Sequence, residues 1–209
     1  MKNIEELCIE AKWGQLTKEE IAYVVKMMNA CNLDDDVGLV RLIYILGHAY
    51  LEEHKHWVEK FIYYPKSTLV SQQALKALCT CWHLTEHYLD EIKMYIRGVD
   101  WDDADEVRLT AINIAGEFLR KKFDKELLQL LVLVFEKLGE TEMLNDTDDY
   151  ARDFLKSCAY EAIARAMGKN HNEIPDNDEI EEAIASGQLS DLDLTVVQKA
   201  HQMMEKNKG

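Results

Sequence analysis

The 209-residue chain is poor in the residues that interrupt helices, with only 2 prolines and 9 glycines. Its β-branched residues form no alternating runs, so strands with one buried face are not expected. No apolar run approaches the roughly 20 residues that a membrane-spanning helix needs. Acidic residues occupy the N-terminal stretch, where a secretory signal would be apolar. We therefore expect an all-α, cytoplasmic protein that makes no contact with a membrane.

Basic residues are also scarce, with 24 Lys and Arg against 39 Asp and Glu, which gives a formal net charge of −15. Proteins bind nucleic acids through Lys and Arg that displace counterions from phosphates, so nucleic acid is not an expected ligand. The same excess of acid favours association with a basic protein. The 5 cysteines are odd in number and irregularly spaced, which is typical of reduced thiols.

Motifs for cofactors and catalysis are missing as well. The chain contains no G-x-S-x-G stretch, no phosphate-binding P-loop and no glycine-rich dinucleotide fingerprint. The spacing of Ser, His and Asp suggests no catalytic set. We therefore expect no cofactor and no enzymatic activity.

One short stretch, His83-Leu84-Thr85-Glu86-His87, does have the H-x-x-E-H order of the inverted zinc proteases. On one continuous helix the two histidines would share a face, and Glu86 could activate a zinc-bound water. The helical-repeat pattern of the chain instead predicts a helix break here, with Thr85 opening a new helix. Because of this break, we expect no metal site. A zinc hydrolase that uses residues 83–87 is kept as the alternative function.

The clearest structural signal is the stretch Trp101–Glu140, which reads as two antiparallel helices joined by a short turn. Apolar residues recur at helical spacing in its first half, namely Val107, Ala111, Ile114, Ala115 and Phe118. Small residues on this face, including Gly116, would let a neighbouring helix approach closely. Asp124 is expected to cap the second helix, whose Leu127–Phe135 run is apolar almost all round and should be buried.

Weaker copies of this pattern lie on both sides. Val70 and Ala74 align with Val107 and Ala111, and Ala151 aligns with Val107 in a third copy. The pattern Val107-Arg108, then Ala111, then Ala115-Gly116, after an acidic turn and before an apolar helix, resembles a HEAT repeat. The resemblance implies a right-handed α-solenoid of about four to five helical hairpins. It would be a single domain, 1–209, with an N-terminal capping hairpin (1–33), central repeats (34–168) and an atypical C-terminal helical cap (169–209).

Caps and periodicity predict the remaining helices. We expect them at Ile4–Lys12, from a capping box at Thr17 to Cys31, from Asp35 or Asp36 through Val37 to Gly47, at Glu52–Tyr63, from a Ser67 cap to Cys81, from Thr85 to Gly98, at Tyr150–Met167, at Asp178–Ala185, and after a cap at Ser190 or Asp191.

Acidic turns precede the first helices of the predicted repeats, and in a solenoid they would form a negative ridge. Aromatic side chains on the second helices would line the concave face, as at interaction hot spots. Two alternatives stay open, because Asp is also a natural helix cap and the aromatics could belong to the core. The candidate partner-binding residues are Asp34, Asp35, Asp36, Trp57, Tyr88, Tyr95, Trp101, Asp102, Asp103, Asp105, Asp146, Asp148 and Asp149.

These observations favour a non-catalytic protein–protein binding module. A small, strongly acidic solenoid resembles in general character the immunity proteins that neutralise basic nuclease toxins. That resemblance implies inhibition by occlusion, in which carboxylates pair with the Lys and Arg of the toxin's active site. A generic assembly scaffold is a further alternative, and it differs only in what it binds.

Overall fold

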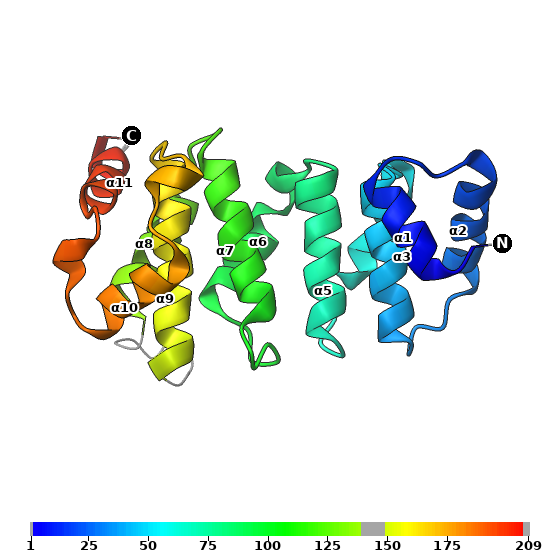
Figure 1. Ribbon diagram of the computed structural model, residues 1–209, viewed down its shortest axis with the longest axis horizontal. Coiled ribbons are helices and arrows are strands. Elements are labelled where there is room, and N and C mark those ends of the chain that lie inside the picture. The colour runs from blue at the N-terminus through cyan, green and yellow to red at the C-terminus, as the bar shows by residue number, and fades with distance from the viewer. Residues whose placement is uncertain (1, 139–148, 207–209) are drawn as a thin grey trace. The chain divides into compact units, whose positions relative to one another are not determined.

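The structure is a computed structural model that describes residues 2–138 and 149–206 (Figure 1). The described residues form helices and no strands, which confirms the all-α prediction. None of these helices is both long and apolar enough to cross a bilayer. The chain forms two compact units, Met1–Tyr88 and Leu89–Gly209, called here the N-terminal and C-terminal units. A single solenoid running through both units stays a prediction.

The N-terminal unit is built around α3, which contacts α1, α2, α5 and the π-helix η3. Its residues Leu39, Ile43 and Leu46 are buried. At Gly47 a Cβ atom would lie 3.1 Å from the Cβ of Ala77 on η3, so the two helices approach closely there. The elements of this unit are α1 (Ile4–Lys12), α2 (Lys18–Ala30), α3 (Asp36–His48), η1 (Glu52–His54), α4 (Lys55–Val58), η2 (Glu59–Phe61), α5 (Thr68–Leu75), η3 (Lys76–Cys81) and η4 (Thr85–Tyr88).

The C-terminal unit is built around α7 and α9 (Figure 1). Helix α7 contacts α6, α8 and α9, and α9 also contacts α8, α10 and α11. A Cβ atom at Gly116 of α7 would lie 2.8 Å from the Cα of Ala162 on α9, so only glycine permits this approach. The elements are α6 (Leu89–Arg97), α7 (Glu106–Leu119), α8 (Lys125–Lys137), α9 (Asp149–Ala166), η5 (His171–Glu173), α10 (Asn177–Ala185), η6 (Leu189–Asp191) and α11 (Thr195–Lys206).

Locally encoded helix starts agree with the sequence prediction. The Thr17 backbone N–H donates to Glu20 Oε2 at 2.8 Å, and the Glu20 N–H donates to Thr17 Oγ1 at 3.3 Å, which is the predicted capping box. Asp124 accepts from the Leu127 N–H at 2.8 Å and so caps α8, as predicted. The predicted bounds of α1 are also confirmed.

Three sequence predictions about helix geometry were wrong. The expected helix at Glu52–Tyr63 is instead a series of single turns, η1, α4 and η2, and no side chain caps its start. Ser67 makes no side-chain capping hydrogen bond to α5. The last helix begins at Thr195, where Asp193 accepts from the Thr195 N–H at 3.2 Å, and not after a cap at Ser190 or Asp191.

Candidate partner-binding site

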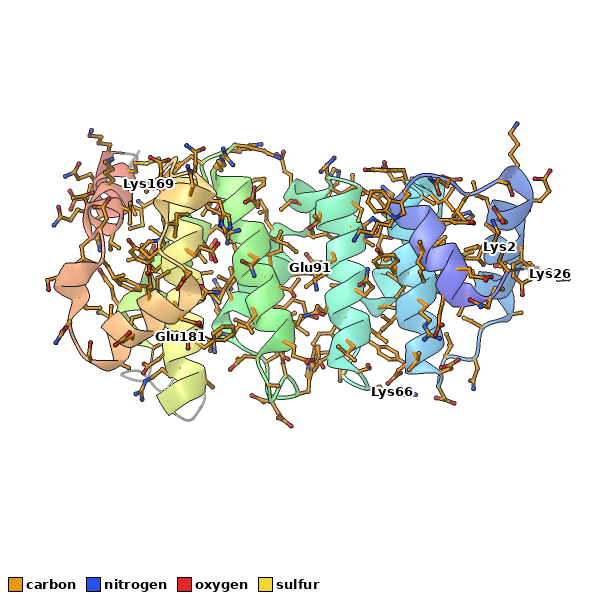
Figure 2. The ribbon with its side chains drawn as sticks, viewed as in Figure 1. Lys2, Lys26, Lys66, Glu91, Lys169 and Glu181 are labelled. Atoms are coloured by element: carbon orange, nitrogen blue, oxygen red, sulfur yellow. The ribbon has the colours of Figure 1, made fainter. Side chains whose placement is uncertain are left out.

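The first predicted acidic turn lies between α2 and α3, and together with the first two residues of α3 it is called here the 33–37 turn. Asp35 accepts from the Gly38 N–H at 3.0 Å and caps α3. Asp34 is exposed and pairs with Lys66 at 3.3 Å (Lys66 is labelled in Figure 2). Asp36 occupies the first turn of α3 and is half-buried, where the helix dipole favours a carboxylate. One of the three carboxylates therefore serves as a cap, and the other two face solvent at least in part.

Two apolar side chains flank these carboxylates. Leu33 is 54% exposed and Val37 is 60% exposed. Val37 lies two residues before the buried Leu39, and a step of two residues turns a helix by about 200°, so the two side chains point to opposite sides. The two-residue spacing between Val37 and Leu39 was the sequence signal from which the exposure of Val37 could have been predicted.

A pocket of about 430 Å³ opens beside the turn. Its walls come from α1, α2, α3 and the turn, and they combine apolar side chains with Asp35 and Arg41. Arg41 in turn donates to Glu5 of α1 at 2.8 Å, which ties α1 to α3 at this place. The 33–37 turn therefore joins carboxylates, exposed apolar side chains and a hollow within one unit.

The second predicted acidic turn, before α7, is organised differently. Asp102 is 5% exposed, and its Oδ2 accepts from the backbone N–H groups of Val107 and Arg108, both at 3.0 Å. Asp102 therefore caps α7 from outside the helix. Asp105 occupies the N-cap position in a left-handed conformation (φ 53°) and makes no side-chain cap.

Asp105 instead pairs with Arg108, whose Nη1 donates to its Oδ1 at 3.2 Å. Arg108 is buried, and its Nε donates to the Ile96 carbonyl at 3.0 Å, so the side chain ties α6 to α7. Burial raises the pKa of both Asp102 and Asp105, although backbone N–H groups oppose this at Asp102 and Arg108 opposes it at Asp105. Sequence reasoning missed Arg108 as the partner that holds this turn.

The other candidates of this turn divide between surface and interior. Asp103 is exposed. Trp101 is half-buried and packs edge-on against Tyr95, with ring centroids 5.9 Å apart. Tyr95 itself is fully buried, so its ring belongs to the core of the C-terminal unit.

The two remaining aromatic candidates lie in the N-terminal unit. Trp57 is half-buried and packs edge-on against Phe61 at 4.9 Å. Tyr88 is buried, and its hydroxyl donates to Glu59 Oε1 at 2.7 Å. This hydrogen bond is the main reason that the pKa of Glu59 is lowered, with His56 contributing further. Tyr88 therefore links its 3₁₀ turn to η2 as part of the folded interior.

The third acidic turn largely cannot be placed. Asp146 and Asp148 lie outside the described residues, and Asp149 begins α9 with its side chain not described. The structure gathers candidate residues at the 33–37 turn and at the turn before α7, each within its own unit.

The H-x-x-E-H stretch contains the predicted helix break. His83 has a left-handed backbone (φ 58°) between η3 and η4, while Glu86 and His87 lie in η4. The two histidines are therefore not on one helical face. Within residues 2–138 and 149–206, no group of three or more His, Cys, Asp or Glu side chains is arranged to hold a metal ion.

Comparisons of the chain with protein-family models, with curated proteins and with solved structures find no match. The candidate site therefore has to be interpreted from its own geometry and charge.

Proposed function

We propose that the chain is a non-catalytic protein-binding module that recognises a basic partner, and that the 33–37 turn is one of its contacts. The observation that carries this proposal is the exposure of Leu33 and Val37 beside the Asp34–Asp36 carboxylates, at the edge of a pocket. Apolar anchors surrounded by charge are typical of interaction hot spots. The net charge of −15 would speed the approach of a basic protein.

We further propose a HEAT-like arrangement of the helices. Support comes from the close approach of α7 and α9 at Gly116, because both are first helices in the predicted repeats. The close approach of α3 and η3 at Gly47 is of the same kind. Within each unit, such stacking places the turns before successive first helices on one edge.

The specific form of the proposal is an immunity protein that inhibits a basic nuclease. In this mechanism, carboxylates of the turns pair with the Lys and Arg that the nuclease uses to hold its substrate, and the active site is covered. Asp34, Asp36 and Asp103 are the candidates with accessible side chains. Asp102 and Asp105 would act indirectly, by fixing the backbone that presents Asp103.

The test is affinity capture from extracts of the source organism at low and moderate salt, with matched charge-reversal variants. We expect a basic protein on the wild-type chain and about fivefold weaker binding for Asp34→Lys or Asp103→Lys. Glu53→Lys is the control, because Glu53 is exposed and follows the opposite end of α3. An equal loss with Glu53→Lys would mean that only net charge matters, and recovery of no basic protein would refute the proposal.

The captured protein then separates the two kinds of module. If it is a nuclease that is inhibited by one equivalent of the chain, the immunity proposal holds. If it is a basic protein without such activity, the chain is a scaffold and the inhibitor proposal is wrong.

A further inference from the structure

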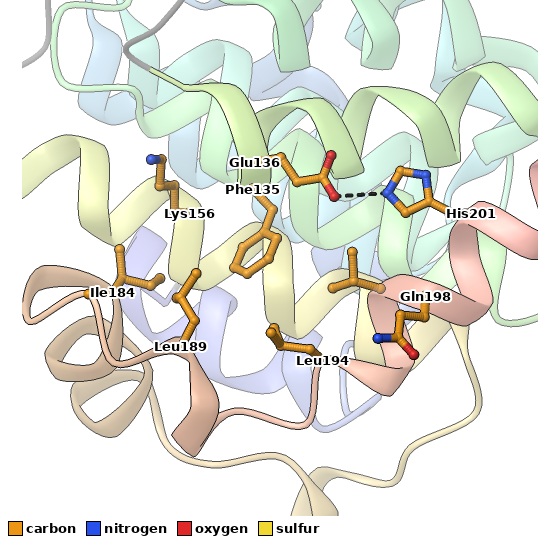
Figure 3. Close-up of a pocket in the computed structure, with 10 residues that line it drawn as sticks. Phe135, Glu136, Lys156, Ile184, Leu189, Leu194, Gln198 and His201 are labelled. Carbon is orange, nitrogen blue, oxygen red and sulfur yellow. Dashed lines mark hydrogen bonds and ion pairs between the residues drawn. The ribbon is translucent and has the colours of Figure 1, made fainter.

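The C-terminal unit contains a second pocket, of about 470 Å³, lined by residues between Phe135 and His201. Figure 3 shows it between the end of α8, α9, the end of α10, the η6 segment and α11. Its apolar lining consists of Phe135, Ile184, Leu189, Leu194 and Val197. The volume lies within the range of small-molecule pockets, and apolar walls of this kind are typical of them.

Three polar features interrupt the apolar lining. Glu136 and His201 pair with each other, with Oε1 and Nε2 2.8 Å apart, and connect α8 to α11. Gln198 extends from α11. Lys156 extends from α9, and in Figure 3 the Phe135 ring lies between it and the Glu136–His201 pair.

Lys156 contributes a cationic side chain to the lining of the pocket. It is half-buried, and no carboxylate within the described part of the chain forms an ion pair with it. In the same unit, Lys93 pairs with Asp124 and Lys169 pairs with Asp193 at 2.9 Å. The one carboxylate in the pocket lining, Glu136, is already held by His201. A ligand with an anionic group would therefore find a cation, whereas a cationic ligand would find its carboxylate occupied.

We propose that this pocket binds a small amphiphile with an apolar chain and a carboxylate head. The chain lies against the Phe135, Leu189 and Leu194 side chains, and the carboxylate pairs with Lys156. A fully polar ligand would lose its hydration on entering the pocket, and the apolar walls would offer its polar groups no hydrogen bonds in return. The proposal is independent of the 33–37 turn, which belongs to the other unit.

The experiment is isothermal titration calorimetry of the full chain near neutral pH with decanoate, octanoate, 1-decanol and decyltrimethylammonium. Decanoate should bind about tenfold more tightly than octanoate, because two more methylenes are buried. It should bind about fivefold more tightly than 1-decanol, because only the carboxylate pairs with Lys156. The cationic amphiphile should bind more weakly than 1-decanol.

Substitutions test the assignment of the head group. Lys156→Gln should abolish the preference for decanoate over 1-decanol and leave the binding of 1-decanol unchanged. Lys199→Gln is the matched control, because Lys199 is exposed on α11 and does not line this pocket. An undiminished preference in Lys156→Gln, or tighter binding of the cationic amphiphile by the wild-type chain, would overturn the proposal.

Location is tested separately. Leu189→Trp should block binding, since Leu189 is 36% exposed and a larger ring can fill the pocket at little cost to folding. If that variant does not fold, amide chemical shifts of the wild-type chain decide the question. Decanoate should shift the amides of Glu136, Gln198 and His201, and shifts confined to other helices would refute the site.

Discussion

Replacing two neighbouring aspartates of the turn before α7 should change stability by very different amounts. Asp102 is buried and accepts two backbone hydrogen bonds, while Asp103 is exposed. We predict that Asp102→Ala strongly destabilises the C-terminal unit and that Asp103→Ala leaves it nearly unchanged. The pair is a stringent test, because the two residues have the same chemistry and adjacent positions.

The magnitude follows from the groups that lose their partner. Without the Asp102 carboxylate, the N–H groups of Val107 and Arg108 have no acceptor in the first turn of α7. Loss of a capping side chain costs about 1 kcal/mol, and a buried donor without a partner costs about 1–3 kcal/mol. We therefore expect a loss of about 2–4 kcal/mol for Asp102→Ala. Asp102→Asn should lose less, because the amide oxygen can still accept. Asp103→Ala should stay within about 0.5 kcal/mol.

Urea unfolding followed by circular dichroism gives the free energies, and hydrogen–deuterium exchange assigns the loss to a segment. Compared with the wild-type chain, Asp102→Ala should increase the exchange rate of the α7 amides more than that of the α3 amides in the N-terminal unit. Equal unfolding midpoints for Asp102→Ala and Asp103→Ala would refute the capping role. The capping role would also be refuted if Asp102→Ala lowered the free energy of unfolding but the amides of α7 did not exchange faster.

Three further outcomes are expected. Gly116→Ala should lower stability by about 1–3 kcal/mol in urea unfolding, because its Cβ would lie 2.8 Å from the Cα of Ala162; Ala162→Gly should rescue it only in part. The pKa of Asp193 is lowered to about 2, chiefly by a hydrogen bond from Thr195 and by Lys169, so its stabilising effect is present above the ordinary value of 3.8 and is lost as the pH falls through about 2. The difference in Tm between the wild-type chain and Asp193→Asn should therefore shrink over that interval. Purified protein should contain less than stoichiometric zinc by elemental analysis, and unchanged metal content in a His83→Ala variant would likewise eliminate the zinc hydrolase.

Features fixed by neighbouring residues were the ones that could be predicted from the sequence. The capping box at Thr17 and the cap at Asp124 involve residues three positions apart, and both are present. Small residues on the first helix of Trp101–Glu140 predicted a close neighbour, and Gly116 meets Ala162 as expected. These inferences succeed because helix caps and helix faces are local geometry.

Features that depend on tertiary packing could not be predicted in the same way. The π-helix η3 (Lys76–Cys81) has no signal in the apolar periodicity. Its residue Ala77 lies against Gly47 of α3. The C-terminal pocket depends on how α11 packs against α8 and α9 and on where η6 follows α10, which no local pattern specifies. Leu189 is an example, because its role in the lining follows only from the packing of three separated segments.

The carboxylates of the acidic turns bring both kinds of inference together. Asp in these turns was compatible with capping and with partner binding, and the sequence could not separate the two roles. Packing separates them: Asp35 and Asp102 are caps, and Asp105 is held by the buried Arg108. Asp103 is exposed and needed by no cap among the described helices. The binding hypothesis is therefore best tested at the exposed carboxylates, because a loss of binding at the caps could come from lost structure alone.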